Sequence, residues 1–197
     1  EENYFFALSN YADFLRNRIA EFPDFVTPAT WQAEVLGLID AGLRDFSVSR
    51  RVRPGSDPWG VPVPGDEEHV LYVWFDALTT YLTGIGFPDN ATLFEHYWPV
   101  DSHVIGKDIL RFHTLYWPAM LASAGLPLPN RVAIHGFMTL EGKRISKTTG
   151  NVISPIEVVN EFGADPVRYY LMRDLSFSSD GDFSRSKLIR RYNDDLG

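Results

Sequence analysis

The strongest constraint on the fold is an alternation of short apolar runs with helical stretches in the middle of the chain. The apolar runs are His69–Trp74, Ser102–Ile105 and Arg131–Leu140, and helical patterns follow the first two at 77–85 and 108–124. A nearly continuous apolar run is typical of a strand buried on both faces of a parallel sheet. Strand–helix alternation predicts α/β structure with right-handed crossovers. We therefore expect half of a doubly wound parallel sheet, followed by a helical junction region.

The segments before this core predict two helices, a strand and a loop. Residues 4–20 carry apolar side chains at three- and four-residue steps, which is typical of an amphipathic helix. A second helix is expected to begin at Thr27–Pro28, with threonine as its cap, and to end at Gly42. Residues 46–50 alternate like a strand. The stretch 51–68 is rich in Pro and Gly and predicts an irregular loop.

The last third of the chain is expected to be helical. Ser154 and Glu157 form a capping box at the start of one helix, and Gly163 is expected to end it. Asp165 opens the next helix, and Ser184 is a candidate cap for the last one. Basic residues on the last helix are interpreted as a solvated face, with contact to a tRNA stem as the alternative.

Composition excludes several classes of protein and site. The 197 residues include no cysteine, which excludes disulfides and a cysteine-based zinc site within the chain. No apolar run is long enough to span a membrane, which takes about 20 residues. The net charge of −8 argues against a main nucleic-acid surface here, because such surfaces are usually basic. The chain starts without a methionine or a signal peptide and stops within a helical pattern, so we expect truncation at both ends.

One basic loop, Leu140–Asn151, stands out as a candidate site. It carries cations at Lys143, Arg144 and Lys147 between two glycines. Cations and hydroxyls on a loop that glycine makes adaptable suit a polyphosphate, on which negative charge grows during phosphate chemistry. The alternative is a solvated basic hairpin loop, because short motifs often match by accident.

The loop sequence Arg144-Ile145-Ser146-Lys147-Thr148 resembles the Lys-Met-Ser-Lys-Ser signature of class I aminoacyl-tRNA synthetases. Arg144, Ile145 and Thr148 replace the usual lysine, methionine and serine, and Lys147 is retained. Four further stretches are similar to the methionyl-tRNA synthetase family: Asn3–Phe6, Trp59–Asp66, Tyr72–Leu78 and Ile105–His113. The resemblance covers nearly the whole chain. It implies a Rossmann-like nucleotide-binding domain, which activates methionine with ATP to methionyl-adenylate and transfers it to tRNA.

The resemblance also implies a methionine pocket, lined by Trp74, Ala77, Leu78, Tyr81, Ile109, His113 and Trp117. Three of these, Ile109, His113 and Trp117, lie four residues apart and would share a helix face. Aromatic rings favour a thioether sulfur by about 0.3–1.5 kcal/mol per contact. The alternative is an ordinary core, in which His113 is a buried, hydrogen-bonded histidine. Some family members have proline at the position of Leu78.

ATP-binding roles follow from the resemblance as well, for Arg50, Gly106, Lys107, Asp108, His135, Gly136 and Lys147. Asp108 would bind ribose hydroxyls or, alternatively, cap its own helix. In catalysis Lys147 would neutralise the β- and γ-phosphates, with help from Arg144 and Ser146 on the same loop. Magnesium would accompany ATP, and no residue of the chain is an evident metal ligand.

The family's His-Ile-Gly-His motif is absent from the chain. We therefore expect this chain to be the C-terminal half of a catalytic domain that is inactive alone, with tRNA bound mainly by regions outside it. The expected division is a helical segment at 1–45, leading out of an inserted domain, and the second half of the Rossmann-like domain at 46–150. A helical junction and the start of an anticodon-binding helix bundle would follow at 151–197. The family suggests residence in the cytoplasm, with an organelle as the alternative.

Two rival functions stay open at this point. One is a class I synthetase for another apolar amino acid such as leucine, isoleucine or valine, although these are not expected to carry this set of aromatic and histidine residues. The other is a non-catalytic binding module that retains the fold. A His-Ile-Gly-His motif upstream in the same reading frame would argue against the second.

Overall fold

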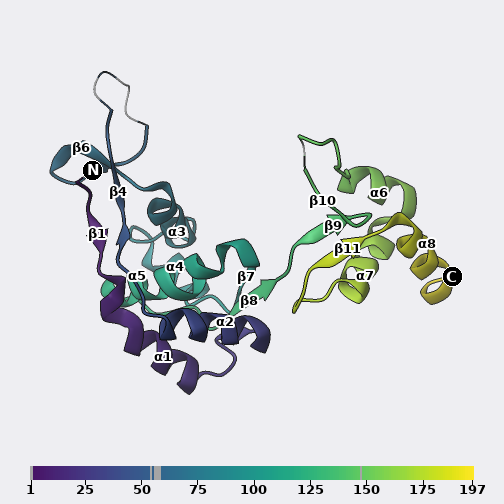
Figure 1. Ribbon diagram of the computed structural model, residues 1–197, viewed down its shortest axis with the longest axis horizontal. Coiled ribbons are helices and arrows are strands. Elements are labelled where there is room, and N and C mark those ends of the chain that lie inside the picture. The colour runs from purple at the N-terminus through teal and green to yellow at the C-terminus, as the bar shows by residue number, and fades with distance from the viewer. Residues whose placement is uncertain (1, 54, 56–58, 147) are drawn as a thin grey trace. The chain divides into compact units, whose positions relative to one another are not determined.

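The computed structural model describes residues 2–53, 55, 59–146 and 148–197, and the α/β class is confirmed (Figure 1). The chain folds into two compact units. Unit 1 comprises residues 1–103 and 108–133, and unit 2 comprises residues 104–107 and 134–197. No helix among the described residues is long and apolar enough to cross a membrane.

Unit 1 is built mainly from helices. Its α-helices are α1 (Ala12–Glu21), α2 (Ala29–Asp40), α3 (Val73–Thr83), α4 (Ala91–Tyr97) and α5 (Trp117–Ser123). Its strands are β1 (Phe5–Phe6), β2 (Val26–Thr27), β3 (Phe46–Ser47), β4 (Ser49–Arg51), β5 (Pro62–Val63) and β6 (Asp66–Leu71). Strands β7 (His103–Gly106) and β8 (Val132–His135) begin in this unit. The core gathers around α3 and α5, on Leu78, Leu82, Trp98, Trp117, Met120 and Leu121.

The strand prediction for the middle of the chain is partly right. Strand β7 lies where Ser102–Ile105 predicts it, and the parallel pairing of β2 with β8 gives the sheet order β2-β8-β7. The parallel strand predicted at His69–Trp74 is wrong. Residues 66–71 form β6, which pairs antiparallel with β4 and β5, and α3 already begins at Val73. An apolar run can be one buried strand, or it can be a half-buried antiparallel strand followed by the first turn of a helix. Hydrophobicity alone does not distinguish these two cases.

The boundaries of several elements also differ from the predictions. The helix predicted over 4–20 begins only at Ala12, because Phe5–Phe6 pairs with Phe46–Ser47 and a 3₁₀ turn, η1 (Leu8–Tyr11), follows. Helix α2 is preceded by Pro28 and has no side-chain cap, so the predicted cap by Thr27 is wrong. The loop predicted over 51–68 contains the hairpin β5–β6.

The segment predicted as a helix over 108–124, with a kink or division at Pro118, forms three consecutive helical elements. A 3₁₀ turn, η2 (Lys107–Ile109), is followed by a π-helical turn, η3 (Phe112–Tyr116), and then by α5. Pro118 lacks a backbone N–H and sits in the first turn of α5, where proline is tolerated. In the wider π turn, the N–H of Trp117 donates to the carbonyl of Phe112, five residues back.

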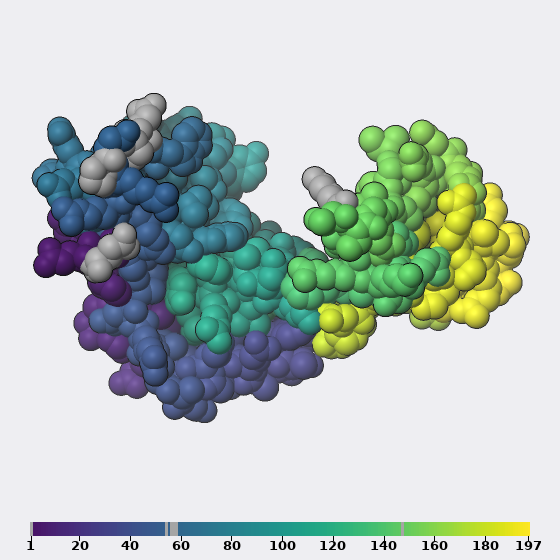
Figure 2. Space-filling view, turned by 45° about the horizontal axis from the view of Figure 1, so that its top comes forward, coloured from purple at the N-terminus to yellow at the C-terminus, as the bar shows by residue number. Residues whose placement is uncertain are grey.

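Unit 2 combines a small sheet with three helices. Strands β9 (Met138–Leu140) and β10 (Lys143–Arg144) form an antiparallel hairpin, and β11 (Gly181–Phe183) runs parallel to β9. The predicted strand Arg131–Leu140 is therefore two strands, β8 and β9. The helices are α6 (Pro155–Phe162), α7 (Ala164–Asp174) and α8 (Arg185–Asp195). In the space-filling view the light-green segments and the yellow α8 form one continuous surface (Figure 2). The buried core consists of Val158, Val167, Tyr170, Phe183 and Leu188.

Of the helix caps predicted in unit 2, the Ser154 cap of α6 is observed and the Ser184 cap of α8 is not. The Ser154 side chain accepts from the N–H of Glu157 at 3.4 Å, which is one of the two bonds of the predicted capping box, and Gly163 ends α6 at a φ of 86°, as predicted. Ser184 precedes α8, but its hydroxyl makes no cap bond. It donates instead to the Glu141 carboxylate, which also accepts from the N–H of Arg185.

We expect Tyr170→Phe to destabilise unit 2. The Tyr170 ring is fully buried, and its hydroxyl donates to the Asp182 carbonyl (3.3 Å) and accepts from the Ser184 N–H (3.1 Å). Removing the hydroxyl leaves a buried N–H without this acceptor, at a cost of about 1–3 kcal/mol in the free energy of unfolding. Urea unfolding measures the change. Tyr169→Phe is the matched control, because the exposed bond from Tyr169 to Asp195 should contribute less; equal losses would contradict the argument.

Candidate functional site

The residues predicted to bind methionine lie on two helical segments of unit 1. One face of α3 carries Trp74, Ala77, Leu78 and Tyr81. The last three follow Trp74 by three, four and seven positions, a spacing that brings side chains to the same side of a helix. Leu78 is buried, whereas Trp74 is 38% exposed and stacks on Phe112 with ring centroids 4.7 Å apart. The face thus runs from the core at Leu78 to the surface at Trp74.

His113 and Tyr81 form the polar centre of this group. The Tyr81 hydroxyl lies 2.7 Å from His113 Nε2, and His113 Nδ1 lies 3.0 Å from the Ile109 carbonyl oxygen. A carbonyl only accepts, so Nδ1 carries the proton. Burial lowers the pKa of His113, which favours the neutral ring. Nε2 therefore accepts from Tyr81, whose own pKa burial raises.

Aromatic rings enclose this hydrogen-bonded pair. Trp117 is 1% exposed, and its ring lies 6.1 Å from that of Tyr81. The ring of His103, on β7, lies 4.3 Å from that of Tyr81, tilted at 46° to it, and 5.8 Å from that of His113. The structure thus brings Tyr81, His113 and Trp117 together, with Ile109 bound through its carbonyl, and their role in binding methionine stays a prediction.

His103 is absent from the predicted site residues. Its side chain is buried, and Nε2 has no hydrogen-bond partner among the described residues. Burial, with a smaller effect from His113, lowers the pKa of His103 to about 4. The sequence signal that could have identified it is a histidine within the apolar run Ser102–Ile105, which leads into Gly106.

Two predicted ATP-binding residues of unit 2, His135 and Gly136, lie at the end of β8. Gly136 is buried, and a Cβ there would lie 2.2 Å from the Ser179 carbonyl oxygen, so close backbone packing requires glycine. His135 is exposed, and its Nδ1 lies 2.8 Å from the Gly136 carbonyl. Packing within unit 2 therefore explains why glycine is required at position 136, apart from any contact with a nucleotide.

Lys107 is held by Asp180 in unit 2, at the end of β7. Its Nζ lies 2.7 Å from Asp180 Oδ1 and 4.7 Å from the centre of the Phe137 ring. Asp180 also accepts from the Phe137 N–H at 2.8 Å, and these two bonds lower the pKa of the carboxyl. Gly106 directly precedes this lysine in β7.

Two further ATP-binding candidates are exposed residues of unit 1. Arg50, on β4, donates to the Ser47 hydroxyl and the Ser49 carbonyl and lies over the Tyr72 ring at 3.9 Å. Asp108 lies exposed in η2. Both side chains are accessible to a ligand.

The basic loop is closed by Asn151. Its side-chain amide donates to the carbonyls of Lys143 (3.3 Å) and Arg144 (3.0 Å), and the backbone carbonyl of Asn151 accepts from the Ser146 N–H (3.0 Å). A cavity of about 610 Å³ is lined by Lys143, Arg144, Ser146, Thr149, Gly150 and Asn151. Lys147, the residue predicted to neutralise the phosphates, lies outside the described residues.

Comparison with known proteins decides the family. A family model described as tRNA synthetases class I (M) matches residues 1–197. The chain belongs to this family. It is 49% identical over 196 residues to the methionine–tRNA ligase of Brucella suis biovar 1 and 50% identical over 196 residues to that of Thermotoga maritima. The match covers all of this chain, but only 37% and 30% of those relatives.

Solved structures of this synthetase family agree. The crystal structure of Mycobacterium tuberculosis methionyl-tRNA synthetase bound by methionyl-adenylate is 48% identical, with a TM-score of 0.91. The alignment covers all of this chain and 38% of that one. The predicted family is thereby confirmed, and the chain spans little more than a third of these relatives.

Acid is expected to destabilise this synthetase unit through His103. Since folding lowers the pKa of His103 to about 4, the unfolded chain takes up the proton first as pH falls. The stabilisation from the neutral ring is complete above the ordinary pKa of about 6.5. As the pH falls toward 4, the free energy of unfolding decreases by about 2–3 kcal/mol. Urea unfolding of His103→Phe should show a weaker loss between about pH 7 and pH 4.5. His96→Phe, at an exposed ring, is the control, and an unchanged pH dependence in His103→Phe would refute the argument.

Gly136→Ala is expected to destabilise unit 2 by about 1–3 kcal/mol, because the new methyl group would overlap the backbone at Ser179. Denaturant unfolding measures the change. Gly37→Ala in α2, where the added Cβ meets nothing within 4 Å, should instead be neutral or stabilising. Equal effects of the two substitutions would contradict the steric explanation.

Proposed function

We propose that this chain is part of a methionine–tRNA ligase, which activates methionine with ATP and transfers it to tRNA. The observation that carries the proposal is the match of the whole chain, at about half identity, to methionine–tRNA ligases. The neutral Tyr81–His113–Trp117 cluster supports methionine as the substrate, because a thioether is uncharged and is favoured by aromatic contacts.

Methionine would bind against Trp74, Ala77, Leu78, Tyr81, Ile109, His113 and Trp117. A neutral His113 fits this role, since a charged imidazolium in the pocket would have to be desolvated at a high cost. An apolar pocket discriminates one methylene by about 1–3 kcal/mol. Shape and sulfur–ring contacts would therefore act together in selecting methionine over leucine or valine.

In the first step a methionine carboxylate oxygen attacks the α-phosphorus of ATP, and the bond to the leaving pyrophosphate breaks. Arg144 and Lys147 would neutralise the charge that grows on the pyrophosphate, with Ser146 on the same loop. Gly106, Lys107, Asp108, His135, Gly136 and Arg50 would hold the nucleotide. Magnesium would arrive with ATP. No cluster of metal-ligand side chains occurs among the described residues.

The rest of the apparatus would lie in other parts of the polypeptide. We propose that 46–150 is the second half of the catalytic domain and that 151–197 is a helical junction leading to an anticodon-binding bundle. The segment 1–45 would lead out of an inserted domain. With its net charge of −8, this chain would contribute little to tRNA binding. Residence in the cytoplasm stays a prediction.

The test is ATP–pyrophosphate exchange by the complete polypeptide across a panel of amino acids. We expect exchange with methionine, and a fall of about a hundredfold in Lys147→Ala, because removing one group that stabilises transition-state charge costs that much. Arg168→Ala, at an exposed cation on α7, is the control for loss of a positive charge. Exchange with leucine or valine would overturn the pocket assignment, and no exchange with any amino acid would favour a binding module.

A further inference from the structure

The turn that opens the basic loop has an unusual backbone. Glu141 and Gly142 connect β9 to β10, with φ angles of 50° and 74°. Glycine adopts such angles freely, whereas a glutamate with positive φ is uncommon and strained. A glutamate at this position therefore calls for a compensating contact of its side chain.

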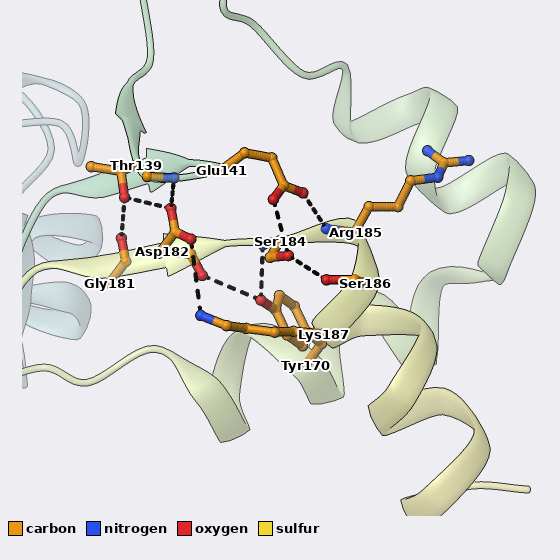
Figure 3. Close-up of polar contacts among 10 residues, drawn as sticks. Thr139, Glu141, Tyr170, Gly181, Asp182, Ser184, Arg185, Ser186 and Lys187 are labelled. Atoms are coloured by element: carbon orange, nitrogen blue, oxygen red, sulfur yellow. Dashed lines mark hydrogen bonds and ion pairs between the residues drawn. The ribbon is translucent and has the colours of Figure 1, made fainter.

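The Glu141 side chain makes such contacts at the start of α8. Its Oε1 accepts from the N–H of Arg185 at 2.9 Å, and its Oε2 accepts from the Ser184 hydroxyl at 3.2 Å (Figure 3). The Glu141 N–H also donates to the Phe183 carbonyl at 3.0 Å. A carboxylate is favoured there, because the N-terminus of a helix carries free N–H groups and partial positive charge. Glu141 thus caps a helix that begins 44 residues later in the chain.

Asp182 holds the same turn from the other side. Its Oδ1 accepts from the Thr139 hydroxyl and from the Gly142 N–H, both at 2.7 Å (Figure 3). These two bonds lower the pKa of Asp182, so it is ionised at neutral pH. One carboxylate therefore joins Thr139, in β9, to Gly142, in the turn.

We propose that Glu141 and Asp182 are positioning residues for the basic loop Leu140–Asn151: together they clamp its first turn to β11 and the start of α8. Asn151 closes the far end of the loop. Lys143 and Arg144, which directly follow this turn, are then presented from a fixed base. This inference rests on the proposed function of the loop in binding the pyrophosphate of ATP.

The decisive variant is Glu141→Gly in the complete polypeptide. Glycine relieves the backbone strain at positive φ but removes the carboxylate. A loss of activity in this variant therefore reports the lost side-chain contacts and not a strained turn. We expect kcat/KM for ATP in pyrophosphate exchange to fall about five- to tenfold, the size of a lost helix cap. The KM for methionine should stay nearly unchanged, and so should the unfolding midpoint, because the strain that glycine relieves at positive φ offsets the lost cap. The control is Asp194→Asn, which neutralises an exposed carboxylate on α8 and should leave kcat/KM for ATP unchanged.

A double-variant cycle tests whether the clamp acts as a unit. Ser184→Ala removes a hydroxyl that donates to Glu141, so it should weaken exchange alone but add little in the Glu141→Gly background. Fully additive effects would overturn the proposal, as would unchanged exchange in Glu141→Gly. An equal rise in the KM values for ATP and methionine, with a lower unfolding midpoint, would overturn it as general damage to the fold.

Hydrogen exchange separates failure of the clamp from failure of the proposed function. In the complete polypeptide the Arg185 and Gly142 amides should be protected, and Glu141→Gly should speed exchange of the Arg185 amide and of amides in 142–150. This readout holds even if the polypeptide exchanges pyrophosphate with no amino acid. Unchanged protection would overturn the clamp while leaving the ligase function intact.

Discussion

The candidate methionine site depends on one hydrogen bond, from His113 Nδ1 to the carbonyl oxygen of Ile109. This bond places the ring proton on Nδ1 and leaves Nε2 to accept from Tyr81. Burial by the surrounding rings keeps both histidines of the cluster, His113 and His103, neutral. A cluster without formal charge can be desolvated at low cost, which suits the side chain of an apolar amino acid.

The helix that carries His113 is shaped to give this geometry. A π turn over Phe112–Tyr116 changes the helical register just before Pro118, and such turns are frequent at functional sites. Within it, two side chains donate to carbonyls four residues back: His113 to Ile109 and Thr114 to Leu110 (2.9 Å). Side-chain donors thus contribute to the hydrogen bonding of a segment whose backbone pattern is irregular. His113 lies within this turn, where it is buried and contacts Tyr81.

Local signals predicted local structure well, and failures arose where a distant partner decided. The Ser154 box, Gly163 and β7 follow from adjacent residues alone. The short strand at Phe5 exists only because Phe46–Ser47 lies beside it, and the cap of α8 comes from a residue 44 positions away. The pocket residues were available from motif resemblance, whereas His103 was not, because its packing on Tyr81 is visible only in three dimensions.

The carboxylates of unit 2 are used in a way that keeps the basic loop positive. Asp180, Asp182 and Glu141 accept from the backbone N–H groups of Phe137, Gly142 and Arg185. Within the part of the chain that the structure describes, no ion pair joins Lys143 or Arg144 to a carboxylate. The acidic side chains therefore brace the backbone beside the loop without neutralising these two cations. Because a polyphosphate competes poorly for cations that are already paired, this separation of roles is what a phosphate-binding loop in an acidic chain requires.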